Sequence, residues 1–224
     1  LVLSMWAAGI AAVAVPIALW RIVGPGFHRV VAGSAALIGA GALAFDSGPG
    51  VIVGLVLLGA SVFAGNRPIA LAATFAAAAV GFFVAALSAG AGWLTLTGAV
   101  TLGAISNEML LGHWYLVDPR LPRWALKSLD GAALVGLIAD FGILAGRGAL
   151  TWGTDAFVVG WAFVALSILS ALLITAVWFA LREPGYNGVM SATGLSYLAI
   201  ITVLGTTISG RSLTVVEGST LLSG

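Results

Sequence analysis

Residues 69–93 read IALAATFAAAAVGFFVAALSAGAGW, a run without a single charged side chain. The hydrocarbon core of a bilayer is about 30 Å thick, so roughly 20 apolar residues in a helix are needed to cross it. A run of this length and composition predicts a membrane-spanning helix. A membrane β-barrel would instead show ~10-residue segments of alternating polarity, which the continuous apolar runs of this chain do not.

The amino-acid composition places the whole chain in the same class. Of its 224 residues, 61% are hydrophobic and 8% are charged, against roughly 25% charged in an ordinary soluble domain. This excludes a soluble enzyme, a disordered chain and a coiled coil. The net charge of +1 gives no general attraction to nucleic acid. The absence of cysteine excludes disulfides, Cys-ligated zinc, iron–sulfur clusters and c-type haem.

The same length criterion predicts an all-α, polytopic integral membrane bundle of about eight transmembrane helices with short loops. The expected spans are residues 1–20, 29–45, 50–65, 69–93, 95–117, 124–146, 155–181 and 188–209. The breaks between the spans contain turn-forming residues and charged residues, except that the break near Gly90 contains no charge. The third span is short and is also compatible with a re-entrant segment. The first is expected to be a span rather than a signal peptide, since it lacks a basic n-region.

Orientation follows from the positions of lysine and arginine. With eight spans, seven of the nine basic residues fall on one side: Arg21, Arg29, Arg67, Arg120, Arg123, Lys127 and Arg182. Arg147 and Arg211 fall on the other. The positive-inside rule then places the first side in the cytoplasm and both termini outside it. We expect a multi-pass protein of a bacterial cytoplasmic membrane, in contact with the lipid bilayer.

Small residues recur at helix-contact spacing. Gly50 and Gly54 are four residues apart, as are Gly142 and Gly146, and the second span carries small residues at 33, 36 and 39. Such patterns let helices approach closely. Packing within the chain is the favoured interpretation, and a dimer face is the alternative.

A short internal sequence similarity also suggests a repeat within the single domain, residues 1–224. Residues 34–39, SAALIG, resemble residues 131–136, GAALVG. This offset would align residues 1–93 with 95–209 as a four-plus-four duplication with both halves in the same orientation.

The fifth span is the most polar, and ionisable groups inside a bilayer are costly. One helical stripe collects its small and polar residues: Thr97, Thr101, Ala104, Glu108, Gly112 and Tyr115. This face should contact protein or a water-filled cleft rather than lipid. Asn107 precedes the deepest carboxyl, Glu108.

The short 118–123 connection predicts an antiparallel hairpin of the fifth and sixth spans. In it, His113 and Asp130 would reach similar depth, so that Asp130 orients the imidazole and Lys127 pairs with Asp130. Asp140 lies inside the sixth span. We therefore take Glu108, His113, Tyr115, Asp130, Asp140 and Asn107 as candidate site residues.

Several interpretations of these residues remain open. The leading one is an integral subunit of a larger membrane redox complex, with other membrane subunits as partners and a scaffold or quinone- and proton-handling role near the cytoplasmic face. A haem b held by His28 and His113, with Arg21 and Arg29 at its propionates, is a weaker variant. The alternative is a small secondary transporter or channel that uses Glu108 and Asp140 in a midplane path. The remaining interpretation is that these polar residues have a purely structural role. No catalytic motif is present, which favours a non-catalytic chain.

Overall fold

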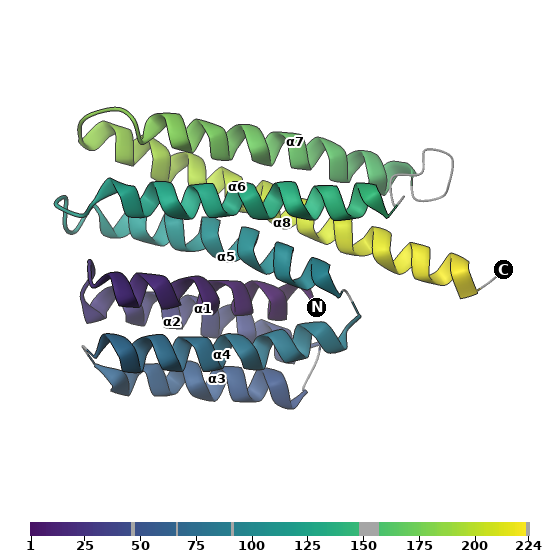
Figure 1. Cartoon of the computed structure of the whole chain (residues 1–224), viewed down its shortest axis with the longest axis horizontal. Coiled ribbons are helices and arrows are strands. Elements are labelled where there is room, and N and C mark those ends of the chain that lie inside the picture. The colour runs from purple at the N-terminus through teal and green to yellow at the C-terminus, as the bar shows by residue number, and fades with distance from the viewer. Residues whose placement is uncertain (46–47, 66, 91, 148–156, 223–224) are drawn as a thin grey trace.

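The computed structural model describes residues 1–45, 48–65, 67–90, 92–147 and 157–222, and no strand occurs in these ranges (Figure 1). The helices are α1 (Val2–Trp20), α2 (Pro25–Leu43), α3 (Pro49–Ser61), α4 (Pro68–Ser88), α5 (Trp93–Trp114), α6 (Arg123–Gly146), α7 (Phe157–Ala180) and α8 (Tyr186–Leu222), and a 3-10 helix, Val62–Ala64, continues α3. Seven helices are long and apolar enough to cross a membrane. The prediction of an all-α, multi-pass membrane bundle is confirmed.

Proline marks where several helices begin. Pro25, Pro49 and Pro68 stand at the starts of α2, α3 and α4. The ring holds φ near the helical value, and the missing N–H is not needed in the first turn of a helix. At the other end of α1, Arg21 caps the helix with a left-handed φ of 55°, which turns the chain back toward α2.

The helices form two groups of four that lie side by side, α1–α4 and α5–α8 (Figure 1). Both groups show the same order of neighbours, because the first helix packs on the second and fourth, and the third also packs on the second and fourth. The main contact between the groups joins their first helices, α1 and α5. A four-plus-four duplication would produce this repetition, and the duplication itself stays a prediction.

Two glycines set the distance between α1 and α5. A Cβ atom at Gly9 would lie 2.0 Å from the carbonyl oxygen of Ala99. One at Gly103 would lie 2.2 Å from the carbonyl group of Gly9. No side chain fits at either position, so the two backbones touch directly, as small residues allow in membrane helices.

Other glycines divide into packed and unpacked positions. A Cβ atom at Gly50 would lie 2.6 Å from the Gly81 carbonyl oxygen of α4, and one at Gly54 would lie 2.7 Å from the Phe82 ring. Here the prediction of packing within the chain is confirmed. Three others have nothing within 4 Å of a Cβ among the described residues: Gly33, Gly142 and Gly146. At these three the predicted packing contact within the chain is wrong, because their helix faces point away from the neighbouring helices.

Two helices differ from the predicted spans. α3 is short and is not among the seven helices long enough to cross a membrane. It runs in one direction alongside α4 without turning back (Figure 1). α8 continues to Leu222, well beyond residue 209. The prediction that Arg211 lies outside the spans is therefore wrong. Arg211 can be buried within this helix because Asp140 neutralises its charge. The expected start of the seventh span at residue 155 falls outside the described residues.

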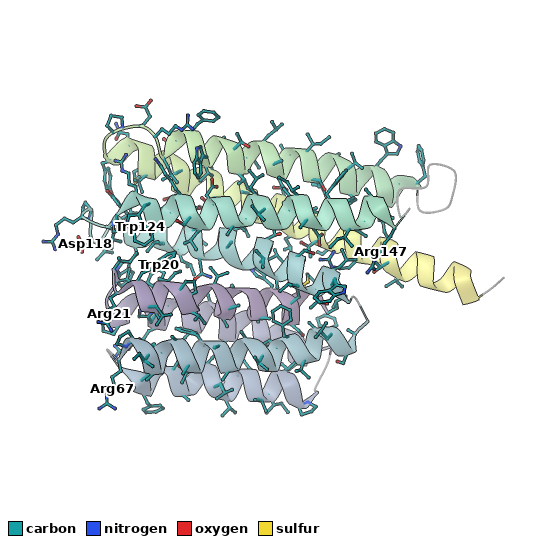
Figure 2. The ribbon with its side chains drawn as sticks, in the orientation of Figure 1. Trp20, Arg21, Arg67, Asp118, Trp124 and Arg147 are labelled. Atoms are coloured by element: carbon teal, nitrogen blue, oxygen red, sulfur yellow. The ribbon has the colours of Figure 1, made fainter. Side chains whose placement is uncertain are left out.

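The two ends of the bundle carry different charges (Figure 2). Arg21, Arg67 and Asp118 lie at one end, which we call the arginine-rich end, and Arg147 lies at the opposite end. The turn after Asp118 is fastened to the α7–α8 turn at the arginine-rich end, because Arg123 Nη2 donates a hydrogen bond of 2.6 Å to the Gly185 carbonyl oxygen. This arrangement agrees with the predicted grouping of loop charges.

Candidate functional site

The polar stripe of α5 lies against protein. Glu108 and Gly112 are buried and Thr97 is half buried. Near its start the stripe contacts α6, where Thr97 donates a hydrogen bond to Asp140. Near its end it contacts α8, because a Cβ at Gly112 would lie 2.4 Å from Thr193 Oγ1. The expectation that this face avoids lipid is confirmed.

Glu108 is the most enclosed carboxyl of the chain's described part, with 0% of its surface exposed. Its Oε2 is in hydrogen-bonding contact with Ser196 Oγ on α8. The same Ser196 hydroxyl also lies 2.8 Å from the carbonyl oxygen of Ala192. Glu108 Oε1 has no hydrogen-bond partner among the described residues. The carboxyl therefore has a single hydroxyl contact and no cation beside it.

Asp130 is buried and His113 is not. Asp130 is 1% exposed and lies on α6, which packs against α5. Its Oδ1 has no hydrogen-bond partner, and in the described ranges no ion pair joins it to Lys127. His113 is exposed on the outer face of α5. The structure thus leaves His113 outside the proposed cluster.

Asn107 and Tyr115 hold helices together. Asn107 Nδ2 donates hydrogen bonds of 3.1 Å to the Ile10 carbonyl oxygen of α1 and 2.9 Å to the Gly103 carbonyl oxygen. It therefore ties α5 to α1 beside the glycine contact. Tyr115 is 7% exposed and belongs to the hydrophobic core at the end of α5. Both residues have a packing role in this arrangement.

Asp140 forms a buried ion pair with Arg211. Arg211 Nη2 lies 2.8 Å from Asp140 Oδ1 and Nη1 lies 3.0 Å from Oδ2, so the guanidinium contacts both carboxylate oxygens. Each residue is 3% exposed. Arg211 Nη2 also donates to the carbonyl oxygen of Leu94 and lies 3.8 Å from Met5 Sδ. Four helices, α1, α5, α6 and α8, therefore enclose this pair.

Gly98 makes room for the pair. A Cβ atom at that position would lie 2.3 Å from Arg211 Nη2. Sequence reasoning missed Arg211 because a single arginine after an apolar run resembles a loop residue. A signal was available, since Asp140 deep in a span requires a cation, and Arg211 is one of the two basic residues predicted for the same side.

Outside the spans, the α5–α6 turn carries an exposed ion pair. Arg120 Nε lies 3.1 Å from Asp118 Oδ1, and the Arg120 backbone N–H also donates to this oxygen. These hydrogen bonds from Arg120 hold the pKa of the Asp118 carboxyl below its usual range. This Asp118–Arg120 ion pair is exposed to solvent, in contrast to the buried Asp140–Arg211 ion pair.

The two histidines lie in different surroundings. His28 on α2 is 5% exposed and contacts the rings of Phe27 and Phe75, with centroids 5.7 and 6.2 Å away. It lines a cavity formed by α1, α2 and α4. His113 is exposed on α5 and does not line that cavity. The haem hypothesis needs both rings in one cavity, and this arrangement gives it no support.

Comparison with known proteins found no family model, curated protein or solved structure that matches the chain. Its function must therefore be argued from its own buried polar groups.

Proposed function

We propose that this chain is a small proton-translocating membrane transporter in which Glu108 takes up and releases the proton. The observation that carries the proposal is the contact of Ser196 with two oxygens, those of Glu108 and of the Ala192 carbonyl. A hydroxyl has one proton to donate. If Ser196 donates to the Ala192 carbonyl, Glu108 must supply the other hydrogen, which requires a protonated carboxyl.

The surroundings of Glu108 favour the same state. An ionised carboxylate buried without a cation would cost several kcal/mol. No ion pair among the described residues supplies Glu108 with a positive charge. Glu108 therefore holds its proton in this closed arrangement. It can lose the proton only when α8 moves away from α5 and water enters.

Asp130 adds a second buried carboxyl in this part of the bundle. It lies two turns into α6 from the arginine-rich end, which is about the depth of Glu108 on α5. Asp130 is 1% exposed, so it too exchanges a proton with water only when the helices separate. Both groups are carboxyls, so this proton exchange needs no cofactor.

The Asp140–Arg211 pair supports the proposal from the other side of the bundle. Two opposite charges in full contact exchange no proton with each other. The pair lies along the half of α6 that leads to Arg147, between Glu108 and that end of the bundle. Opening toward that end would require this pair to separate. The polar face of α5 thus links an exchangeable carboxyl to a fixed ion pair, as in alternating access.

The test is proton flux in vesicles. Purified protein is reconstituted into liposomes that contain a pH-sensitive dye, and a pH step is applied with the membrane potential clamped. We expect the protein to accelerate internal acidification, and the Glu108→Gln variant to return the rate to that of protein-free vesicles. Glu183→Gln, which removes an exposed carboxyl in the α7–α8 turn, is the matched control and should keep the full rate.

Flux no faster than in empty vesicles would overturn the proposal. An unchanged rate in Glu108→Gln would also overturn it, because that carboxyl would then carry no proton. Size-exclusion profiles of the two variants show whether a lost rate reflects misfolding.

A second candidate, the quinone-facing subunit of a redox complex, is favoured by one feature. A groove of about 340 Å³ lies between the two helix groups. Its rim residues Leu37 and Ile201 are 76% and 67% exposed, so it faces the surrounding lipid. Inside it, Trp6 Nε1 donates a 2.8 Å hydrogen bond to Ser106 Oγ. Quinone and partner subunits recovered with the gently extracted protein would favour this candidate over transport.

A further inference from the structure

A cavity opens between α1, α2 and α4 at the arginine-rich end. Its volume is about 390 Å³. Six of its lining residues matter here: Ala18, Arg21, Gly24, His28, Pro68 and Leu71. Four of them are apolar or lack a side chain, and the two polar ones are an arginine and a histidine. Among the described residues no carboxylate lines it, so its polar side chains can offer an anion hydrogen-bond donors and positive charge.

His28 is the unusual member of this lining. It is 5% exposed, and its Nδ1 has no hydrogen-bond partner among the described residues. A buried ring nitrogen without a partner loses the hydrogen bond that it would make in water. The ring also borders a second cavity beside Arg29, whose volume of about 10 Å³ holds no more than a water molecule. A polar ligand in the larger cavity would supply the missing hydrogen bond.

The start of α2 adds positive character to the same cavity. Gly24 is the N-cap of this 19-residue helix, and it has no side chain to accept a hydrogen bond from the first turn. Pro25 has no N–H, and the Phe27 N–H donates a hydrogen bond of 3.2 Å to the Gly24 carbonyl oxygen. The helix dipole therefore supplies most of the positive character that favours a negative group at this position. Arg21, the C-cap of α1 and three residues before Gly24, is exposed and borders the cavity.

We propose that this cavity binds a phosphoryl anion, held by the Arg21 guanidinium and the His28 imidazole at the start of α2. Arginine suits a phosphate because its planar group presents several N–H donors. Ala18, Pro68 and Leu71 supply an apolar wall beside the anion. The phosphoryl group belongs either to the head group of an anionic phospholipid or to a free phosphate in the adjoining water.

Two measurements on the full chain distinguish these sources. In the first, the protein is taken from vesicles with equal amounts of phosphatidylglycerol and phosphatidylcholine, and the retained lipids are counted by native mass spectrometry. In the second, the melting temperature in detergent is compared between inorganic phosphate and chloride at equal ionic strength. The variants are Arg21→Gln and His28→Leu. The matched control is Arg182→Gln, which removes the same charge from the α7–α8 turn away from the cavity.

We expect the native chain to prefer an anion in at least one measurement. Arg21→Gln should weaken that preference about tenfold, as loss of one charge-assisted hydrogen bond would, and Arg182→Gln should leave it unchanged.

Enrichment of phosphatidylglycerol identifies a lipid head group, and stabilisation by phosphate identifies a free anion. No preference for either anion overturns the proposal. An equal loss in Arg182→Gln also overturns it, because the effect would then be general surface charge. Arg21 is exposed, so this variant tests the site even if His28→Leu misfolds.

Discussion

Asp140 and Arg211 are each tolerated inside the bilayer because of the other. Their contact uses both carboxylate oxygens, and Thr97 and the Leu94 carbonyl occupy further hydrogen-bonding positions. A buried ion pair contributes little net stability, since the cost of removing both charges from water offsets their attraction. Losing one member is different, because the remaining charge is then buried alone.

A double-mutant cycle at this pair should show strong coupling. We expect Asp140→Asn and Arg211→Gln each to lower the free energy of unfolding by about 3–5 kcal/mol. The double variant should lose clearly less than the sum of the two. The measurement is unfolding in mixed micelles, followed by tryptophan fluorescence.

The exposed pair in the α5–α6 turn is the control for this cycle. Asp118→Asn removes a carboxylate whose charge is screened by water, so no measurable change in unfolding is expected. Additive losses at Asp140 and Arg211 would contradict the pairing described above.

At the scale of elements, the contact between α1 and α5 determines how the two helix groups meet. The two backbones touch where Gly9 faces Gly103 and Ala99. Asn107 and Trp6 add hydrogen bonds across the same interface, to the Ile10 carbonyl and to Ser106. Apolar attraction gives little force between helices in lipid, so close packing and such hydrogen bonds supply the association.

A methyl group at this contact should push the helix groups apart. We expect Gly9→Ala to lower the free energy of unfolding by about 1–3 kcal/mol, as overpacking does in other cores. Gly142→Ala is the matched control, because a Cβ there meets nothing within 4 Å among the described residues. Thermal unfolding in detergent measures both. Equal stability of the two variants would show that α1 and α5 do not touch as described.

At the scale of the whole molecule, α1 begins and α8 ends toward the same end of the bundle, opposite the arginine-rich end (Figure 1). Arg67 and Asp118 lie at the arginine-rich end and Arg147 at the other (Figure 2). We propose that the arginine-rich end faces the cytoplasm, in accordance with the positive-inside rule.

Accessibility of single cysteines tests this topology. The chain has no cysteine, so Arg67→Cys, Asp118→Cys and Arg147→Cys each introduce one thiol. We expect a membrane-impermeant maleimide to label position 147 in intact cells, and positions 67 and 118 only after the cytoplasmic side is exposed. Labelling of 67 and 118 from opposite sides would contradict the bundle. Reversed labelling of all three would contradict the orientation alone.

Helix positions and the grouping of loop charges were predictable because both depend on local chemistry. In lipid, backbone groups must hydrogen-bond within their own segment, so a long apolar run is a helix whatever surrounds it. The burial of the α5 stripe followed from the same reasoning, since its polar residues repeat at helical spacing. The spans at 69–93, 95–117 and 124–146 correspond closely to α4, α5 and α6.

The pairing of polar groups required the packed structure. His113 and Asp130 are close along the predicted hairpin, yet rotation of α5 about its axis directs His113 outward. Arg211 resembled a loop residue until α8 was seen to continue past it and meet Asp140. Which side chains meet between two helices depends on how each helix is rotated about its axis, on the depth of each residue in the bundle and on the distance between the two helix axes. Those quantities arise from contacts between residues far apart in the chain, and no local pattern contains them.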